Sequence, residues 1–338
     1  MGPAVSSRST ILPPPEAFEE PGSTWEDFNR RRRVFYSRIR GNFDLLIGGG
    51  ILAAYVLVGI AALAVYGSSV TTLATNFELS QPPPLGPSLA HPFGVMSGVG
   101  VDTFAALFQA TPIDLALVLG PILLAATIGI LVGAHSGLQR GSRDIVLTSA
   151  ADVFAGVPPF FLVLVLYLGV VAFFPPEQSL VVFALLLIVV LWPYYARPVR
   201  ARAQQISSEP FVEGARAAGA LPRRLLFRHV IPNSYYPVLA QAPVDVFTIF
   251  FVLTLFPYLS CAAGAAGIFG DLTPFPVIPY PEWGYLLAQG SCYGWSPIAS
   301  VNYWWMYTFP ALAILVFGIA LALACDGATR LAGRVRTT

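Results

Sequence analysis

The side chains that most often do chemistry are few in this chain, and none has the spacing of a common site. The 338 residues include three cysteines and three histidines, with no CxxC pair and no zinc-type spacing. There is no lysine, which a phosphate-binding Walker A loop requires. Gly-x-Ser-x-Gly and His-Glu-x-x-His are also absent. The sequence predicts no catalytic, cofactor or metal site, and the alternative is a metal site assembled from distant residues.

Ionisable residues inside apolar segments are the remaining candidates, because charge in a membrane usually serves function. Asp245 lies among Val, Phe and Ile, where it would line a path or bind a partner on another helix. Asp114, Asp152 and Asp326 lie near the ends of apolar segments, and we expect them to reach the interface. His135 also lies at such an end.

The composition indicates a membrane protein. Of the residues, 56% are hydrophobic and 11% are charged, whereas a soluble domain has about 25% charged residues. About 20 apolar residues are needed to cross a bilayer as a helix. Six segments are near or above that length, the fourth being slightly short: 44–66, 113–135, 145–173, 179–196, 237–260 and 303–325. The sequence therefore predicts an all-α membrane protein with six transmembrane helices.

The arginines give an orientation. All 19 lie in four segments that alternate with the predicted spans, and the three segments on the other side have none. Cytoplasmic loops are enriched in arginine, so we expect both termini in the cytoplasm. The arginine-bearing segments are 1–43, 136–144, 197–236 and 326–338; the others are 67–112, 174–178 and 261–302.

The N-terminal region precedes the six-span domain, which we place at 44–330. Residues 1–23 are rich in Pro, Ser and Glu, a composition typical of disorder. Residues 24–43 form an apolar face opposite a row of arginines, which predicts an amphipathic helix in the membrane interface. The alternative is a solvated basic helix. The apolar residues are Trp25, Phe28, Phe35 and Ile39.

Pro158 and Pro159 interrupt the third apolar segment. Proline removes a backbone donor and clashes with the preceding turn. We expect a kink there, with a plain helix break as the alternative.

The segment 197–236 is too long for a simple hairpin and predicts two short helices joined by a turn. Ser208 or Glu209 would cap the first helix, and Pro210 suits its first turn. Gly219 stands where a left-handed C-terminal cap would fall. The expected apolar face comprises Phe211, Val212 and Ala215.

Pro222 would open the second helix and Pro232 would end it. Its apolar residues would be Leu225, Leu226 and Val230, beside Arg223, Arg224 and Arg228. A partly apolar helical knob needs a surface to dock against. The alternative is a basic surface loop without a partner.

The run Glu213-Gly-Ala-Arg-Ala-Ala-Gly219, with Pro232 thirteen residues on, resembles the EAA signature of binding-protein-dependent ABC importer permeases. In that signature Gly214 replaces the first Ala, and His229 replaces an Ile. The run Phe227-Arg-His-Val-Ile-Pro-Asn233 is similar to the oligopeptide/dipeptide-type branch.

Other matches to that branch are spread along the chain: His91-Pro-Phe-Gly94, Pro281-Glu-Trp-Gly284, Trp304-Trp-Met-Tyr-Thr-Phe-Pro310 and Asp326-Gly327. Two regions depart from it, the residues 95–102 after the first of these motifs and the long segment 261–302. Both face outward in the predicted topology, so they concern the substrate and its binding protein.

The resemblance implies a permease in a prokaryotic plasma membrane. It implies a homologous second permease subunit, two cytoplasmic ATPase subunits that carry ATP and Mg, and an external substrate-binding protein. The knob, residues 209–231, would dock on an ATPase, and Glu213 would fix it through an arginine or a helix N-terminus. The alternative for Glu213 is a solvated carboxylate. The coupling residues so implied are Glu213, Gly214, Ala215, Gly219, His229 and Pro232.

The resemblance implies peptides as the commonest substrate, with oligosaccharides as the alternative, since sugar importers share this branch. An aromatic outer segment suits either sugar stacking or contact with a binding protein. A secondary transporter is the rival class, but we see no paired broken segments in two halves. A membrane-embedded enzyme lacks its motifs here.

Cys261 and Cys292 both fall in an outer segment, where oxidation is possible. We predict a disulfide between them, which would close a loop of 30 intervening residues and stabilise it by about 3–4 kcal/mol. Cys325 should remain a free thiol at the inner end of the last span.

Overall fold

A computed structural model of the chain separates into two units, Met1–Phe43 and Asp44–Thr338. It describes residues 29, 32, 37, 39–67, 85–96, 101–138, 142–171, 173–175, 178–265, 282–294 and 303–335. Most of the first unit therefore lies outside the described residues. This includes residues 1–23 and most of the expected amphipathic helix at 24–43, of which Ile39 is helical.

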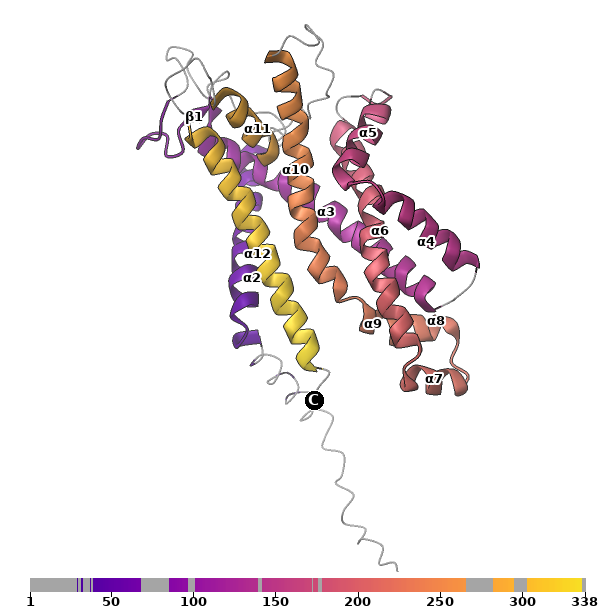
Figure 1. Cartoon of the computed structure of the whole chain (residues 1–338). Helices are drawn as coiled ribbons and strands as arrows, with labels where there is room; N and C mark the ends of the chain where they lie inside the picture. The colour runs from indigo at the N-terminus through magenta and orange to yellow at the C-terminus, as the bar shows by residue number, and fades with distance from the viewer. Residues whose placement is uncertain are drawn as a thin grey trace, which may run out of the picture. The chain divides into compact units, whose positions relative to one another are not determined.

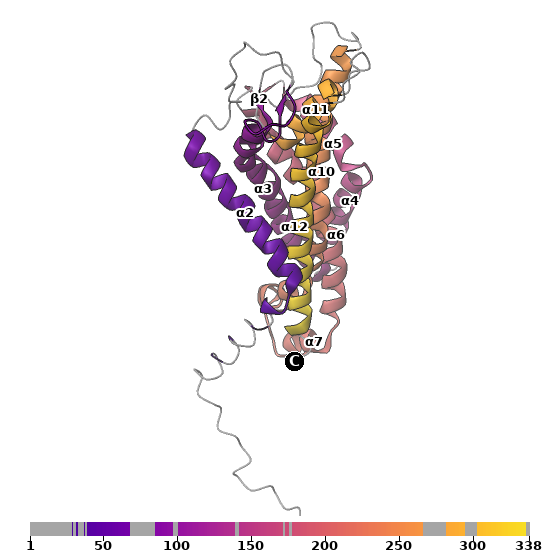
Figure 2. The same cartoon turned by 90° about the vertical axis from the view of Figure 1, so that its left-hand side faces the viewer.

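The described part of the second unit is mostly helical, and its only described strands are two short ones of two residues each, which pair with each other (Figures 1 and 2). A π-helical turn, Leu226–Val230, joins two short helices. The elements are α2 (Phe43–Tyr66), β1 (Val95–Met96), β2 (Val101–Asp102), α3 (Thr103–Leu138), α4 (Ser142–Ala155), α5 (Pro159–Val171), α6 (Ser179–Ser207), α7 (Pro210–Ala217), α8 (Pro222–Leu225), α9 (Ile231–Ser234), α10 (Pro237–Ala265), α11 (Trp283–Gly294) and α12 (Trp305–Val335).

Five of the described helices, α2, α3, α6, α10 and α12, are long and apolar enough to cross a membrane. Helices α4 and α5 are bent by 91° relative to each other, so they give a sixth span only if the bent pair is counted as one span. The bend lies at the Pro158-Pro159 pair, so the break considered from the sequence is confirmed. The expected single span 145–173 is wrong in this respect, since no continuous helix covers it.

Helices α3 and α6 form the closest pair in the bundle because glycines line the contact. Gly129, Gly133 and Gly137 recur at every fourth position of α3 and therefore share one face. A Cβ at Gly133 would lie 2.4 Å from the Ala196 carbonyl oxygen, so only glycine allows this approach. Small residues at this spacing are typical of membrane helices that pack backbone to backbone.

Helix α11 corrects the sequence analysis, which treated 261–302 as an outer segment without a helix. It packs against α10, α12 and α3 at the end of the bundle opposite α7 (Figure 1). Trp283, at its start, is 1% exposed. Its ring centroid lies 5.4 Å from that of Tyr55, 5.7 Å from that of Phe250 and 5.9 Å from that of Phe317. One tryptophan thus joins four helices.

The first of the family-like motifs, residues 91–94, directly precedes the strand pair β1 and β2 before α3. His91 Nδ1 lies 2.7 Å from Asp102 Oδ2, and Asp102 Oδ1 accepts the Ala105 N–H at 2.8 Å. Gly94 has φ +74, and a Cβ there would lie 2.6 Å from the Trp305 ring. Asp102, in the stretch that departs from the family pattern, therefore both holds the hairpin and caps α3.

Candidate functional site

The knob, residues 209–231, begins with α7. Pro210 takes the first helical position, where its missing N–H costs nothing. Glu209 occupies the N-cap position, but its side chain makes no capping bond. Ser208 Oγ instead donates back to Gln205 O at 2.9 Å. The side-chain cap expected from Ser208 or Glu209 is therefore wrong.

Gly219 ends α7 as the sequence predicted, in the left-handed conformation with φ +80. The Ala220 N–H donates to Ala215 O and the Gly219 N–H to Arg216 O, both at 3.0 Å. These two bonds make a Schellman cap, which reverses the chain after the helix. The turn therefore sets the angle between α7 and α8.

A small apolar core holds the two helices to the body. Val212 of α7, Leu225 of α8 and Ile206 near the end of α6 are 0%, 3% and 3% exposed and contact one another. The partly buried residues packed around them are Leu138, Ala215 and Ala220. Burying side chains of this size contributes about 1.5–3 kcal/mol each. The knob is thus fixed to the ends of α3 and α6.

The second half of the knob differs from the prediction. Instead of one helix ended by Pro232, α8 passes through the π-helical turn into α9, and Pro232 lies in the first turn of α9. Proline is tolerated there for the same reason as at the start of any helix. Val230 is fully buried in the main core, and Asn233 Nδ2 donates to His229 O at 2.6 Å. The knob is therefore continuous with α10 through α9.

The outer surface of the knob carries both charge and exposed apolar side chains. Phe211, Leu221 and Phe227 are 49%, 72% and 52% exposed, so Phe211 of the expected apolar face is not part of the small core that buries Val212. Exposed apolar residues grouped on one surface indicate an interaction site. The Phe211 ring is 6.2 Å from the His229 ring.

Glu213 lies in the first turn of α7, where the helix dipole favours a negative charge. It is exposed, and within the described residues its side chain has no hydrogen bond or ion pair. Gly214 beside it is also exposed, with open space around its Cα. Glu213 borders a cavity of about 610 Å³, which is lined by Leu138, Ser207, Ser208, Glu213, Arg216, Pro222 and Leu225.

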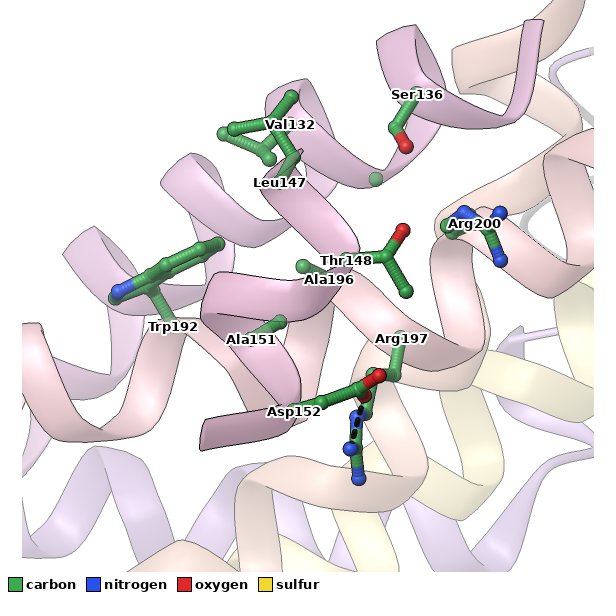
Figure 3. A pocket seen from close by; sticks show the side chains of 11 residues that line it. Val132, Ser136, Leu147, Thr148, Ala151, Asp152, Trp192, Ala196, Arg197 and Arg200 are labelled. Atoms are coloured by element: carbon green, nitrogen blue, oxygen red, sulfur yellow. Dashed lines mark hydrogen bonds and ion pairs between the residues drawn. The ribbon is translucent and has the colours of Figure 1, made fainter. Parts of the chain in front are cut away.

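Two ion pairs, which the sequence analysis missed, attach α4 to α6 behind the knob. Asp144 accepts from Arg200 Nε at 2.7 Å and Nη2 at 2.8 Å, and Ser136 of α3 also donates to it. The Arg200 bonds hold the pKa of Asp144 at about 2. Asp152 pairs with Arg197 (Figure 3). In the sequence these two arginines resemble the other arginines of the predicted cytoplasmic segments. Only their spacing on α6 could have suggested that both pair with the same neighbouring helix.

A cavity of about 180 Å³ lies between α3, α4 and α6 beside these pairs. Figure 3 shows Asp152 directed at Arg197, and Trp192 at one edge of the cavity. Both arginines are already engaged by carboxylates. The arrangement therefore braces α4 and leaves little free charge for a ligand.

The other predicted residues lie apart from the knob. Asp245 is 2% exposed on α10 and accepts from Gln241 Nε2 of the same helix at 2.9 Å, so its role on the path or in a contact between helices remains a prediction. Asp152 and Asp326 are about half exposed, as expected. Asp114 is 1% exposed, so the expectation that it reaches the interface is wrong. It accepts the Trp283 N–H at 3.0 Å, because α3 begins ten residues earlier than predicted.

Cys325 is a free thiol on α12. The side chains of Cys261 and Cys292 lie outside the described residues, so their disulfide remains a prediction. In the part that the structure describes, no group of three or more His, Cys, Asp or Glu residues could hold a metal ion.

Comparison with known proteins gives the family of this chain. Residues 125–333 match the family described as binding-protein-dependent transport system inner membrane component. A Brucella suis protein described as a peptide transport system permease is 30% identical over 82% of this chain and 84% of its own length. A dipeptide transport system permease of Alkalihalophilus pseudofirmus is 24% identical over 93% of this chain and 91% of its own. A D,D-dipeptide transport system permease of Escherichia coli is 28% identical over 72% and 73%. The chain therefore belongs to the family of inner membrane components of binding-protein-dependent transport systems.

Proposed function

We propose that this chain forms half of the translocation path of an ATP-driven peptide importer and that its knob receives the force from an ATPase subunit. The observation that carries the proposal is the knob itself. It presents Glu213 and three exposed apolar side chains, yet its core and its cap fix it to α6. A surface that is held rigidly and exposes apolar side chains is suited to bind an ATPase subunit and to transmit its movement.

Peptides are the substrate class that the relatives support, since the proteins compared above are described as peptide or dipeptide permeases. An oligosaccharide importer is the alternative, and none of those three relatives favours it. The segment 261–302 that would meet a binding protein lies largely outside the described residues.

The machine requires other subunits. This chain has no lysine and hence no Walker A loop, so ATP and Mg would bind to two cytoplasmic ATPases. A second permease, homologous but different from this chain, would complete the path, and an external protein would deliver the peptide. This partner set rests on the family and on the resemblance to its oligopeptide/dipeptide branch. Native mass spectrometry of the purified complex tests it, and two copies of this chain without a second permease would overturn it.

Coupling would work through packed contacts. Closure of the ATPases would displace the knob, and the knob would carry α6 with it through Val212, Leu225 and Ile206. Because Val230 anchors the other side in the main core, α10 would move as well. Rigid-body motion of packed elements is a common form of such transitions.

The test uses the full complex in liposomes with its ATPases and binding protein. Gly219→Val places a β-branched residue at φ +80, which costs roughly 1–2 kcal/mol or more and re-aims α8. Gly219→Asn is the matched control, since asparagine tolerates this conformation. The new side chains cause no steric clash at Cβ, because a Cβ at Gly219 would meet nothing within 4 Å.

Glu213→Ala tests the charge, and Gly214→Ala is its control on the same exposed surface. We expect Gly219→Val and Glu213→Ala to insert normally but to lose stimulated ATP hydrolysis and uptake of a labelled peptide. The two controls should retain both activities. Normal uptake in both test variants would refute docking through the knob. If the complex retains stimulated ATP hydrolysis but takes up a sugar instead of peptides, the proposed substrate class is refuted and the docking role is not.

A further inference from the structure

Two carboxyl groups are buried together where α11 meets α3. Asp114 is 1% exposed and Glu282 is 0% exposed, and they are near each other because Asp114 binds the backbone N–H of Trp283, the residue that follows Glu282. Each has one oxygen occupied by a backbone amide at the start of α11. Asp114 Oδ2 accepts the Trp283 N–H at 3.0 Å, and Glu282 Oε2 accepts the Gly284 N–H at 2.7 Å. The other oxygens, Asp114 Oδ1 and Glu282 Oε1, have no partner in the described part of the chain.

No basic side chain is available to neutralise this pair. The chain has no lysine, and its arginines avoid residues 41–139 and 229–329 altogether. Those two ranges include α2, α3, α10, α11 and most of α12. His91, which lies 23 residues before Asp114 in the sequence, is engaged by Asp102, which precedes Asp114 by twelve residues or about 18 Å of helix.

The other titratable groups on the surrounding helices do not replace a cation. Tyr55 of α2 contacts Trp283, but its hydroxyl donates to Ala313 O at 3.0 Å. His135 of α3 is 21 residues from Asp114, about 31 Å along the helix. The remaining titratable side chains described on these helices are Asp44 and Tyr66 of α2, Asp245 and Tyr258 of α10, Tyr285 of α11, and Tyr307, Cys325, Asp326 and Arg330 of α12. Arg330 is engaged by Asp44 and Asp326.

Two adjacent carboxylates without a cation cannot both be ionised in a buried site. We propose that Asp114 and Glu282 bind one proton between them and that this proton keeps the first turn of α11 attached to α3. The proton makes one of the two carboxyl groups a neutral acid, so that the buried pair carries a single negative charge. Its loss leaves two like charges, which separate as α11 opens. Neither activity nor partner identity enters this argument, so it is independent of the proposed function.

The direction of the pH dependence follows from proton counting. Burial raises the pKa of Glu282 to about 8, whereas an exposed glutamate titrates near 4. The closed state thus holds a proton that the open state releases at neutral pH. Opening of α11 must become easier as pH rises, by up to tenfold per pH unit for one proton. The dependence ends once the pH exceeds the pKa of the closed state.

Hydrogen exchange of the α11 amides in the purified complex measures this opening. Rates in the wild type and in the double variant Asp114→Asn, Glu282→Gln are compared at equal pH, so the intrinsic pH dependence of exchange cancels. From pH 6 to 8 the ratio of wild-type to variant rates should rise by up to 100-fold. Asp326→Asn removes an exposed carboxylate and should behave as the wild type does.

A ratio that stays constant with pH would overturn the proposal. Slower α11 exchange on adding Na⁺ or Ca²⁺ at constant ionic strength, lost in the double variant, would also overturn it by assigning the site to a cation. If the double variant does not assemble, Glu282→Gln alone serves. Its amide can donate to the Asp114 carboxylate, so its exchange should lack the extra pH dependence.

Discussion

Gly133→Ala is the most direct probe of the packing that supports the knob. A Cβ at Gly133 would lie 2.4 Å from Ala196 O, 3.1 Å from Ala196 C and 3.1 Å from Arg200 N. All three atoms belong to the backbone of α6, so no side-chain rotation relieves the clash. Extra volume in a packed contact costs typically 1–3 kcal/mol.

Gly120→Ala is the matched control on the same helix. A Cβ at Gly120 meets nothing within 4 Å, and both variants gain the same helix propensity, about 1 kcal/mol. The difference between them therefore isolates the contact. We expect Gly133→Ala to be less stable than Gly120→Ala by about 1–3 kcal/mol.

The assay is equilibrium unfolding of the purified chain in mixed micelles, followed by tryptophan fluorescence. A difference of 1.4 kcal/mol corresponds to tenfold in the unfolding equilibrium, which such curves resolve. Equal midpoints for the two variants would refute the backbone contact at Gly133. Binding-protein-stimulated ATP hydrolysis should fall in Gly133→Ala and remain normal in Gly120→Ala.

Three further predictions concern single contacts. Asp144→Asn should lower the free energy of unfolding at pH 7 by about 2 kcal/mol, since Arg200 depresses the pKa of Asp144 to about 2. The bonds to Arg200 stabilise only the ionised Asp144 carboxylate, so the difference in unfolding free energy between wild type and variant should disappear as the pH falls from 4 towards 2. A difference that persists at pH 2 would contradict this prediction. Trp283→Phe should lower the thermal midpoint, because it removes the 3.2 Å hydrogen bond from Trp283 Nε1 to Leu107 O, at a cost of about 0.5–1.5 kcal/mol, and replaces the indole that packs among three other helices; an unchanged midpoint would mean that neither contact contributes to stability. In a variant without the third cysteine, Cys261 and Cys292 should resist thiol labelling until reduced, and labelling of both in unreduced protein would exclude the disulfide.

The sequence predicted those features that depend on local chemistry or on long apolar runs. Gly219 was identified because glycine is the residue most common in a left-handed cap, and the structure gives it φ +80. The five long spans were identified because their apolar runs are near or above the length of a bilayer crossing. The break at Pro158 follows from the missing backbone donor.

The features that escaped prediction depend on contacts between distant segments. Helix α11 is too short and too mixed in composition to be recognised alone, and it is stable here because Trp283 packs among three other helices. The π-helical turn at Leu226–Val230 carries Pro232 onward into α9, which local propensity does not indicate. The burial of Asp114 required knowing that Glu282 and Trp283 return to it.

The length of α6 has a mechanical consequence. Its 29 residues, Ser179–Ser207, continue unbroken through two prolines and span about 44 Å at 1.5 Å per residue. Helix α6 packs against α3 along the glycine face and ends at the knob, so a movement of the knob would tilt α6. A tilt of about 5° at the knob displaces the far end by about 4 Å, over a helix of that length. Such leverage would let a small movement at the knob widen the opposite end of the bundle by about that distance.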